Sequence, residues 1–409
     1  SAYPIYARLT GEKNDKFKEF LNQAVDWLNR PLADASSVEC EQYLSRSRIL
    51  ESLRLASRRE RCDWEYPIGE TNTLLMLLPD VNESRMFWRF QALQVRHLVA
   101  RKAYDEAIQA AQVGFAMTRH IEQAPFVVHD LVAISCANLM LTQLTAMIEQ
   151  PDSPNLYWAL SSLPAPLVDV RESVELELDM LELSFPDATR LDRLRGDEWT
   201  RLLDQLLEAQ HNYGSDLGLL NNPREKATYL VECHAKAMRY FVKHEVYSAS
   251  QLEEMRLEEL LVRWMLHPHA VVRDDLLKWT FSSYPSTERW QANDEAAWKF
   301  DPDRSQLAER LYAGRLGVLG ADVRLQQRLA ILRVVEALRM YAAAHDRKLP
   351  SQLEDLANVP VPVDPLTGTP FLYDLTPSGS AHLRSRAPSE YSPDYLLHIR
   401  PTRDAGSEE

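Results

Sequence analysis

The sequence predicts a mainly α-helical protein, an irregular solenoid of stacked helical hairpins with a small α+β module at its C-terminus. Glycine is scarce: 12 of the 409 residues are glycine, and none lies between Gly114 and Gly196 or between Gly218 and Gly314. Because turns and strand-rich folds use glycine at positive φ, long glycine-poor stretches rich in Leu, Ala, Glu, Gln and Arg indicate helices. Apolar residues recur at helical spacing along most of these stretches.

The chain is long enough for one large core or for two to three ordinary ones. We expect a helical body over residues 1–320, with a further boundary near 186–222, where the helical pattern breaks at Gly196 and again at 214–223. The glycines of "GRLGVLG", at 314, 317 and 320, predict a joint before a last long helix over 322–345. Residues 321–400 then form the α+β module, and 401–409 a disordered terminus.

Apolar periodicity and capping signals predict helices along the whole body. The first helix has Asn14 as a candidate cap and Pro31 just past its end. Pro268, in "HPH", predicts the end of one helix and the start of another, because proline is favoured in a first helical turn. The predicted ranges are 14–31, 38–56, 84–101, 104–122, 126–150, 154–162, 167–183, 224–243, 250–266 and 271–281.

The stretch "KAYDEAIQAA" opens the second helix of a hairpin over residues 84–122. Tyr104 begins this helix, and the small residue Ala107, three positions later, lets the two helices approach. This spacing resembles the middle of a tetratricopeptide repeat. The resemblance is partial, since Gln91 and Arg119 stand where the repeat has Trp and Pro. No second copy follows at the repeat's period of about 34 residues, so we expect irregular hairpins.

Helical solenoids bind proteins through their concave face. Trp88, Arg89, Arg96 and Tyr104 lie on this hairpin, and we expect them to contact a protein partner at the rim of that face. Core packing is the alternative for Trp88 and Tyr104, because large aromatic side chains usually fill the space between helices.

The charge balance disfavours nucleic acid as a partner. The 46 basic and 60 acidic residues give a net charge of -14, which repels phosphate backbones and anionic lipid headgroups over a Debye length.

The apolar run "LVAISCANLMLTQLTAMI", at 131–148, reaches the lower length limit of a membrane-spanning helix. Its five polar residues instead predict the central buried helix of the body. No signal peptide or membrane anchor is found within residues 1–409. A start at Ser1 without methionine fits either a processed precursor, from which an export signal has been removed, or a trimmed chain. Membrane association would need such a segment.

Candidate chemistry is sparse. Cys40, Cys62, Cys136 and Cys233 make no ligand spacing, which indicates buried thiols, with a Cys40–Cys62 disulfide as the alternative. "HEVYS" has Ser248 where a zinc-protease helix needs its second histidine, and no GxSxG elbow is present. We therefore expect no cofactor and no metal. The alternative is a metal-dependent or hydrolytic enzyme with its site in the His-rich region, residues 211–298, where Trp290 and Trp298 belong to a possible aromatic groove with Trp279.

The C-terminal segment carries an ordered series of patterns. A long amphipathic helix is followed by a short helix from Ser351, with Glu354 completing a capping box, and by an Asp-Pro turn at 364–368. Residues 370–375 and 381–385 predict a β-hairpin. This order resembles the globular part of the major pseudopilin of type II secretion. The matching residues are Ala337, Leu338, Tyr341, Pro350, Leu353, Leu356, Asp364, Pro365, Gly368, Pro370 and Tyr373.

The resemblance covers residues 337–373 and has two departures. The hydrophobic N-terminal segment of a pseudopilin is replaced by the helical body, and "SRAPSEYSPDY" stands where the family has an acidic calcium loop. The whole layout is similar to large bacterial envelope-type proteins that pair a helical body with this tail, which implies export or membrane association and no catalytic residue. We therefore expect a non-enzymatic scaffold or protein-interaction protein of the cell envelope, periplasmic or secreted, with a cytoplasmic protein as the alternative. The oligomeric state stays open.

Overall fold

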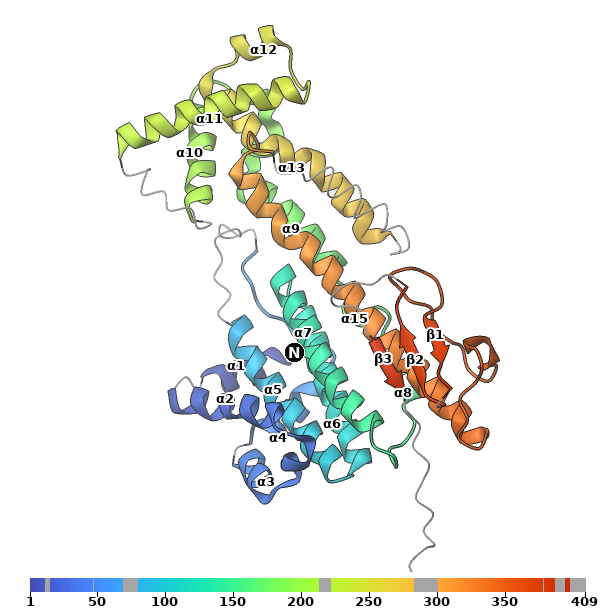
Figure 1. Cartoon of the computed structure of the whole chain (residues 1–409). Helices are drawn as coiled ribbons and strands as arrows, with labels where there is room; N and C mark the ends of the chain where they lie inside the picture. Colours follow the sequence, from blue (N-terminus) through green and yellow to red (C-terminus); the bar gives the residue numbers. More distant parts are fainter. Residues whose placement is uncertain are drawn as a thin grey trace, which may run out of the picture. The chain divides into compact units, whose positions relative to one another are not determined.

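The computed structural model describes residues 1–11, 15–46, 48–68, 80–212, 222–282, 301–377, 379–386 and 394–397. This part of the chain is mainly α-helical, as the glycine-poor pattern predicts, with a small antiparallel sheet near the C-terminus (Figure 1). The chain forms two compact units. Unit 1 contains Ser1–Trp64, Pro79–Val170 and Gly320–Glu409, and unit 2 contains Glu65–Leu78 and Arg171–Leu319. The predicted domain limits stay a prediction; the units group residues 320–409 with the N-terminal helices.

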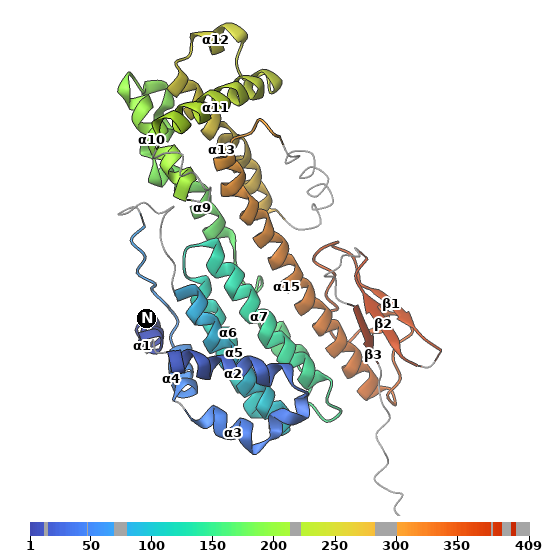
Figure 2. The ribbon, with the colours of Figure 1, turned by 60° about the vertical axis from the view of Figure 1, so that its left-hand side comes forward.

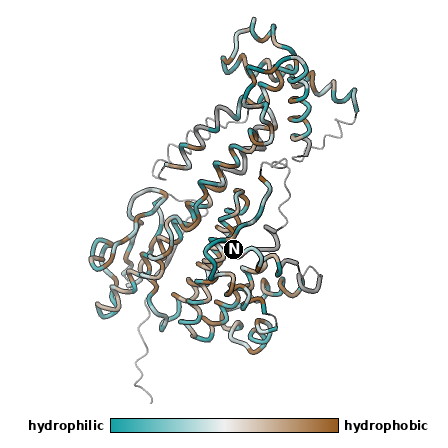
Figure 3. The backbone as a smooth tube through the Cα atoms, turned by 180° about the vertical axis from the view of Figure 1, so that it is seen from behind, coloured by the Kyte–Doolittle hydropathy of each residue, from teal (hydrophilic) through white to brown (hydrophobic). Residues whose placement is uncertain are grey.

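Hydrophobic residues recur between hydrophilic ones along the helices of both units (Figure 3), and most of the buried side chains are apolar. The helices of the N-terminal part of unit 1 are α1 (Tyr3–Gly11), α2 (Asp15–Asn29), the 3-10 helix η1 (Leu32–Ser36), α3 (Val38–Ser45), α4 (Ile49–Ser57), α5 (Asp80–Ala100), α6 (Tyr104–Glu122), α7 (Val127–Ile148) and α8 (Tyr157–Ser161). The pattern predicted over 38–56 thus contains two helices, α3 and α4.

Helices α5, α6 and α7 pack on one another and form the centre of unit 1 (Figure 2). The predicted hairpin is confirmed: α5 ends at Ala100 and α6 starts at Tyr104. Lys102 has φ +59°, and the amides of Lys102 and Ala103 donate to the carbonyls of Val99 and Leu98. This is the Schellman pattern that caps a helix C-terminus. Ala107 is fully buried beside this turn.

Helix α7 is the buried helix that the apolar run predicts. Among the described residues it is the one helix whose length and composition meet the criteria for a membrane span, and 61% of its most apolar window is buried inside the structure. The core helix of a globular protein meets the same criteria.

Glu122, the last residue of α6, is a carboxylate held inside unit 1. Its Oε1 accepts a hydrogen bond of 2.6 Å from the Asp169 amide. Burial raises the pKa of Glu122 to about 7, although the Asp169 amide opposes this shift.

Because the folded-state pKa lies above the unfolded value, Glu122 stabilises unit 1 at low pH, and this contribution is lost as the pH rises through 7. We expect Glu122→Gln to match the wild type at pH 5 and to be more stable by about 2 kcal/mol at pH 8. Urea unfolding at both pH values measures this. Glu106→Gln, at an exposed position of the same helix, should show no such difference between the two pH values. A parallel pH response of the Glu122→Gln variant and the wild type would contradict the prediction.

The C-terminal part of unit 1 is built on the second half of α15 (Gln306–Ala344). Arg328 of α15 donates to the backbone and side chain of Asn138 and to Thr142, both on α7. The buried carboxylate of Glu336 accepts hydrogen bonds from Arg339 and from the Leu156 amide. Residues 320–344 of α15 are therefore joined to α7 and to the segment that leads into α8.

The predicted hairpin is confirmed in strands β1 (Leu372–Leu375) and β2 (Ala381–Arg384), which pair with Tyr373 opposite Leu383. Strand β3 (Asp394–Leu397) pairs antiparallel with β2. The short helix is the 3-10 helix η6 (Leu353–Asp355), and its capping box joins Gln352 to Asp355. The predicted box from Ser351 to Glu354 is therefore wrong by one residue, since the backbone tightens to a 3-10 turn there.

Asp364 of the Asp-Pro turn is fully buried and accepts four hydrogen bonds. The donors are Nε2 of Gln327 on α15, at 2.9 Å and 3.1 Å from the two carboxylate oxygens, the Ser385 hydroxyl beyond β2, and the Leu366 amide. The turn, the sheet and α15 thus meet at this one side chain. Tyr373 also donates to the carbonyl of Pro350.

Unit 2 contains α9 (Arg171–Ser184), the 3-10 helix η3 (Pro186–Arg193), α10 (Asp197–Asn212), α11 (Pro223–Lys243), α12 (Ala249–Glu254), α13 (Leu257–Phe281) and the first half of α15. Helix α10 lies between the two predicted breaks of the pattern, after Gly196 at φ +52°.

Two predicted breaks are wrong. Pro268 lies inside α13, and Gly314, Gly317 and Gly320 lie inside α15. A proline in a helix interior costs about 3 kcal/mol and a glycine about 1 kcal/mol. Burial offsets these costs: α13 buries Leu260, Leu261, Val262, Trp264, Met265 and Leu266, and α15 buries Val318, Leu319, Val323 and Leu325. The predicted cap Asn14, the residues 290 and 298 of the aromatic groove, and the terminus 401–409 lie outside the described residues.

Candidate functional site

The four residues predicted to contact a partner have different surroundings. Trp88 is 1% exposed, packs near Tyr6, and its indole donates to Thr118 Oγ1 at 3.4 Å. Arg96 is half-buried and donates to the carbonyl of Arg30 at 2.6 Å. Trp88 therefore belongs to the core, because α5 is packed by α1, α2, α6 and α7 and has little free surface.

Arg89 and Tyr104 are half-buried. The Tyr104 hydroxyl lies 3.4 Å from Asp152, which also accepts from Lys102 at 2.8 Å. The structure therefore places Tyr104 beside an exposed ion pair at the α5–α6 turn. Partner contact by Arg89, Arg96 and Tyr104 stays a prediction.

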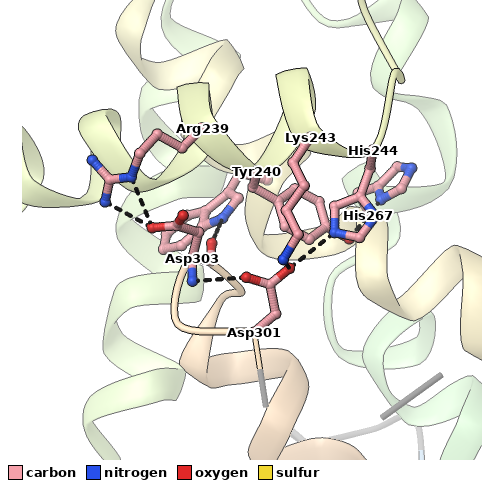
Figure 4. Close-up of polar contacts among 8 residues, drawn as sticks. Arg239, Tyr240, Lys243, His244, His267, Asp301 and Asp303 are labelled. Atoms are coloured by element: carbon pink, nitrogen blue, oxygen red, sulfur yellow. Dashed lines mark hydrogen bonds and ion pairs between the residues drawn. The ribbon is translucent and has the colours of Figure 1, made fainter. Parts of the chain in front are cut away.

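The His-rich region contributes to a polar cluster in unit 2 (Figure 4). Tyr240 and Lys243 come from the last turn of α11, and His244 is the residue directly after it. His267 comes from α13, and Asp301 from the segment before α15. Asp301 is 4% exposed, and its Oδ2 accepts from His244 Nε2 at 2.9 Å and from Lys243 Nζ at 3.1 Å. Tyr240 Oη lies 3.1 Å from His267 Nδ1. The Tyr240 and His244 rings are 4.4 Å apart, centre to centre.

The electrostatics of this cluster favour an ionised Asp301. Burial raises the pKa of Asp301, but the hydrogen bonds from His244, from the Asp303 amide and from Lys243 outweigh burial and lower it to about 2. Burial lowers the pKa of His267, with His244 adding to the effect. Burial also raises the pKa of Tyr240. The cluster therefore combines a carboxylate anion with a neutral tyrosine.

The same segment is bonded at a second point. Arg239 Nε and Nη2 donate to Asp303 Oδ1 at 3.0 Å and 2.7 Å, and the Trp264 indole donates to the Asp303 carbonyl at 2.8 Å. The hydrogen bonds of Asp301 and Asp303 therefore hold residues 301–303 against the C-terminal half of α11 and against α13. The cluster contains a His–Asp pair, an arrangement that can orient an imidazole for proton transfer. The same hydrogen bonds hold residues 301–303 in place, and we call this set of bonds the clasp.

We expect Asp301→Asn to loosen this clasp, because the amide loses the charge-assisted bonds to Lys243 and His244. The expected loss at pH 7 is about 2 kcal/mol. Since the folded-state pKa of Asp301 is depressed, its contribution is present above pH 4 and is lost as the pH falls toward 2. Hydrogen exchange at the amides of residues 301–305 should accelerate in the variant at pH 7. Asp152→Asn, which removes an exposed ion pair, should leave exchange there unchanged, and equal rates in Asp301→Asn and the wild type would contradict the prediction.

The described residues contain no group of three or more His, Cys, Asp or Glu side chains placed to hold a metal ion. His234 is exposed, and the side chain of His211 lies outside the described part. All four cysteines are free and buried, as predicted.

Trp158, in unit 1, is 63% exposed and is not among the contact residues that the sequence predicted. Helix α8 buries Tyr157 and Leu160, whose spacing of three residues places Trp158 on another face. The Tyr157 hydroxyl donates to the carbonyl of Pro360, and Arg333 donates to Ser161 at 3.0 Å. The Trp158 and Tyr157 rings meet edge to face at 5.0 Å. Trp158 thus faces solvent from a helix whose other face is anchored in unit 1, and the spacing of Tyr157 and Leu160 was the signal for it.

Comparisons with protein-family models, with curated proteins and with solved structures gave no match.

Proposed function

We propose that this protein is a non-enzymatic helical scaffold that binds a protein partner, and that Trp158 anchors the contact. The observation that carries the proposal is the exposure of Trp158 on a helix whose other face is buried in the core. Tryptophan is enriched among the residues that dominate binding energies at protein interfaces. A side chain held in place before binding loses less conformational entropy when a partner covers it.

The finer parts of the proposal are the fold family and the compartment. We propose an irregular solenoid of helical hairpins, like tetratricopeptide arrays in its α5–α6 turn, with a pseudopilin-like C-terminal part, in the bacterial cell envelope. The support is the order of elements over 337–384: the end of α15, η6, the Asp364 turn and the β1–β2 hairpin follow in the sequence that the resemblance implies.

Site-specific photocrosslinking tests the proposal. A photoreactive amino acid at position 158, in the protein expressed in its native cells, should give one dominant crosslinked partner. The matched control is position 38, where Val38 is 67% exposed on α3. Trp158→Ala should weaken the purified complex at least about tenfold, since interface tryptophans often contribute more than 1.4 kcal/mol. Identical crosslinked products at positions 38 and 158, or no crosslink at position 158, would contradict the proposal.

The second candidate is a hydrolytic or metal-dependent enzyme that uses the Asp301 cluster. The observation that favours it is the bond between buried Asp301 and His244, a pairing that orients catalytic imidazoles. Elemental analysis and melting with and without a chelator separate the two candidates. A stoichiometric transition metal whose removal lowers the melting temperature would favour the enzyme.

A further inference from the structure

Helix α11 carries an apolar stripe on its solvent-facing side. Its opposite face is buried through Cys233, Ala237, Tyr240 and Phe241. On the outer side, Val231 is 69% exposed and Val242 is 58% exposed. Two exposed valines alone are ordinary on a protein surface, so the spacing of the residues between them decides whether they form one contact surface.

The stripe has the spacing of a coiled-coil seam. Thr228, Val231, Ala235, Met238 and Val242 follow one another at intervals of 3, 4, 3 and 4 residues, as a and d positions do. With about 100° per residue, they span an arc of about 80° that is opposite Cys233. Thr228, Val231, Ala235 and Val242 are exposed and Met238 is half-buried. The Thr228 hydroxyl donates to the carbonyl of Arg224 within the helix, so its methyl group remains for an apolar contact.

The charges beside the stripe favour a second copy of the same helix as the surface that covers it. Glu232 and Arg239 lie along the same side of the stripe, each one position after a d residue, Val231 or Met238. Glu232 is nearer the start of the helix and Arg239 nearer its end. The Arg239 guanidinium is 57% exposed while it binds Asp303. When a second α11 lies antiparallel, with Val231 opposite Val242 and Ala235 opposite Met238, Glu232 of each copy meets Arg239 of the other. A parallel pair instead sets Arg239 beside His234 and Glu232 beside Ala227, without opposite charges.

We propose that two copies of this chain associate through α11 in antiparallel orientation, with Thr228, Val231, Ala235, Met238 and Val242 forming the seam. This interface contains other residues than the proposed Trp158 contact and does not rest on the proposed function. The seam covers little more than two heptads, so the association is weak and depends on protein concentration and on salt.

Sedimentation equilibrium of the full chain tests the association. The apparent mass should rise toward that of a dimer from low to high micromolar protein, and Val231→Glu should raise the dissociation constant at least about tenfold, because it places an unpaired carboxylate in the seam. The matched control Val38→Glu, at an equally exposed site on α3, should leave the dissociation constant unchanged. A monomer at every concentration overturns the proposal.

Cysteine crosslinking tests the orientation. Val231→Cys and Val242→Cys proteins should form a covalent dimer when they are mixed and oxidised, and much less when each is oxidised alone. In the antiparallel pair, position 231 of one copy faces position 242 of the other, and these two positions are about 16 Å apart along one helix. Like positions of the two copies are therefore farther apart than the Cα separation of about 7 Å that a disulfide allows, so each variant alone should crosslink slowly. The native cysteines are buried, and Val38→Cys reports random collision. Crosslinking of Val231→Cys with itself as fast as in the mixture would overturn the antiparallel arrangement.

Discussion

Replacing Gly114 with alanine should lower the free energy of unfolding by about 2 kcal/mol, although alanine favours helix over glycine by about 1 kcal/mol. A Cβ atom on Gly114 would lie 2.2 Å from Met140 Sδ and 2.8 Å from Met140 Cγ. Met140 is fully buried on α7, so its side chain must shift within a closely packed interior. The new methyl group must therefore separate α6 from α7 or force Met140 into a strained rotamer.

Two further variants test whether the contact with Met140 is the cause. Gly317→Ala adds the same methyl group to a helical glycine with nothing within 4 Å of the new Cβ, and it should stabilise the protein by about 0.5–1 kcal/mol. In a Met140→Ala background, Gly114→Ala should cost little, because the space is then free. Urea unfolding of the wild type, Gly114→Ala, Met140→Ala and the double variant measures the coupling free energy between positions 114 and 140. Equal effects of Gly114→Ala in both backgrounds would show that the contact with Met140 is not the cause.

Replacing Asp364 with alanine should cost about 3 kcal/mol of unit 1 stability, because the buried amide of Gln327, the hydroxyl of Ser385 and the Leu366 amide each lose an acceptor. The residue is fully buried, so water does not readily replace the carboxylate. The expected readout is a lower urea midpoint together with faster hydrogen exchange in β1 and β2.

The control for Asp364 is Asp374→Ala on β1. Asp374 is exposed and pairs with Arg384 at 3.0 Å, and exposed ion pairs contribute little. A small effect of Asp364→Ala, similar to that of Asp374→Ala, would mean that the turn is held by its backbone hydrogen bonds alone, such as the one from the Gly368 amide to the Asp364 carbonyl.

Sequence patterns predicted a helix or a hairpin well where the residues within that element determine its backbone conformation. The α5–α6 hairpin follows from Tyr104 and the short turn before it, and α7 from its apolar run. The β1–β2 hairpin follows from the alternation on either side of "TPSGS". In each case near neighbours along the chain determine the backbone conformation, and the tertiary structure agrees with them.

The candidate surfaces were much less predictable. Trp88 and Trp158 are the same residue type on predicted helices, yet one is in the core and the other faces solvent. His244 and Asp301 are 57 positions apart, and a spacing along the sequence does not show that two such side chains meet. The exposed stripe of α11 has the same periodicity as a buried face, so pattern alone does not tell which face of that helix is covered.

By itself, then, the sequence determined that the chain is mainly helical, where several helices begin and end, α6, α7 and α11 among them, and that a short antiparallel hairpin follows them. Only the tertiary structure decided that α13 continues through Pro268 and α15 through three glycines, and which aromatic and ionisable side chains meet or face solvent. The physical reason is range. Helix and turn preferences come from contacts within a few residues, whereas the burial that outweighs a proline or pairs His244 with Asp301 exists only after distant segments have packed together.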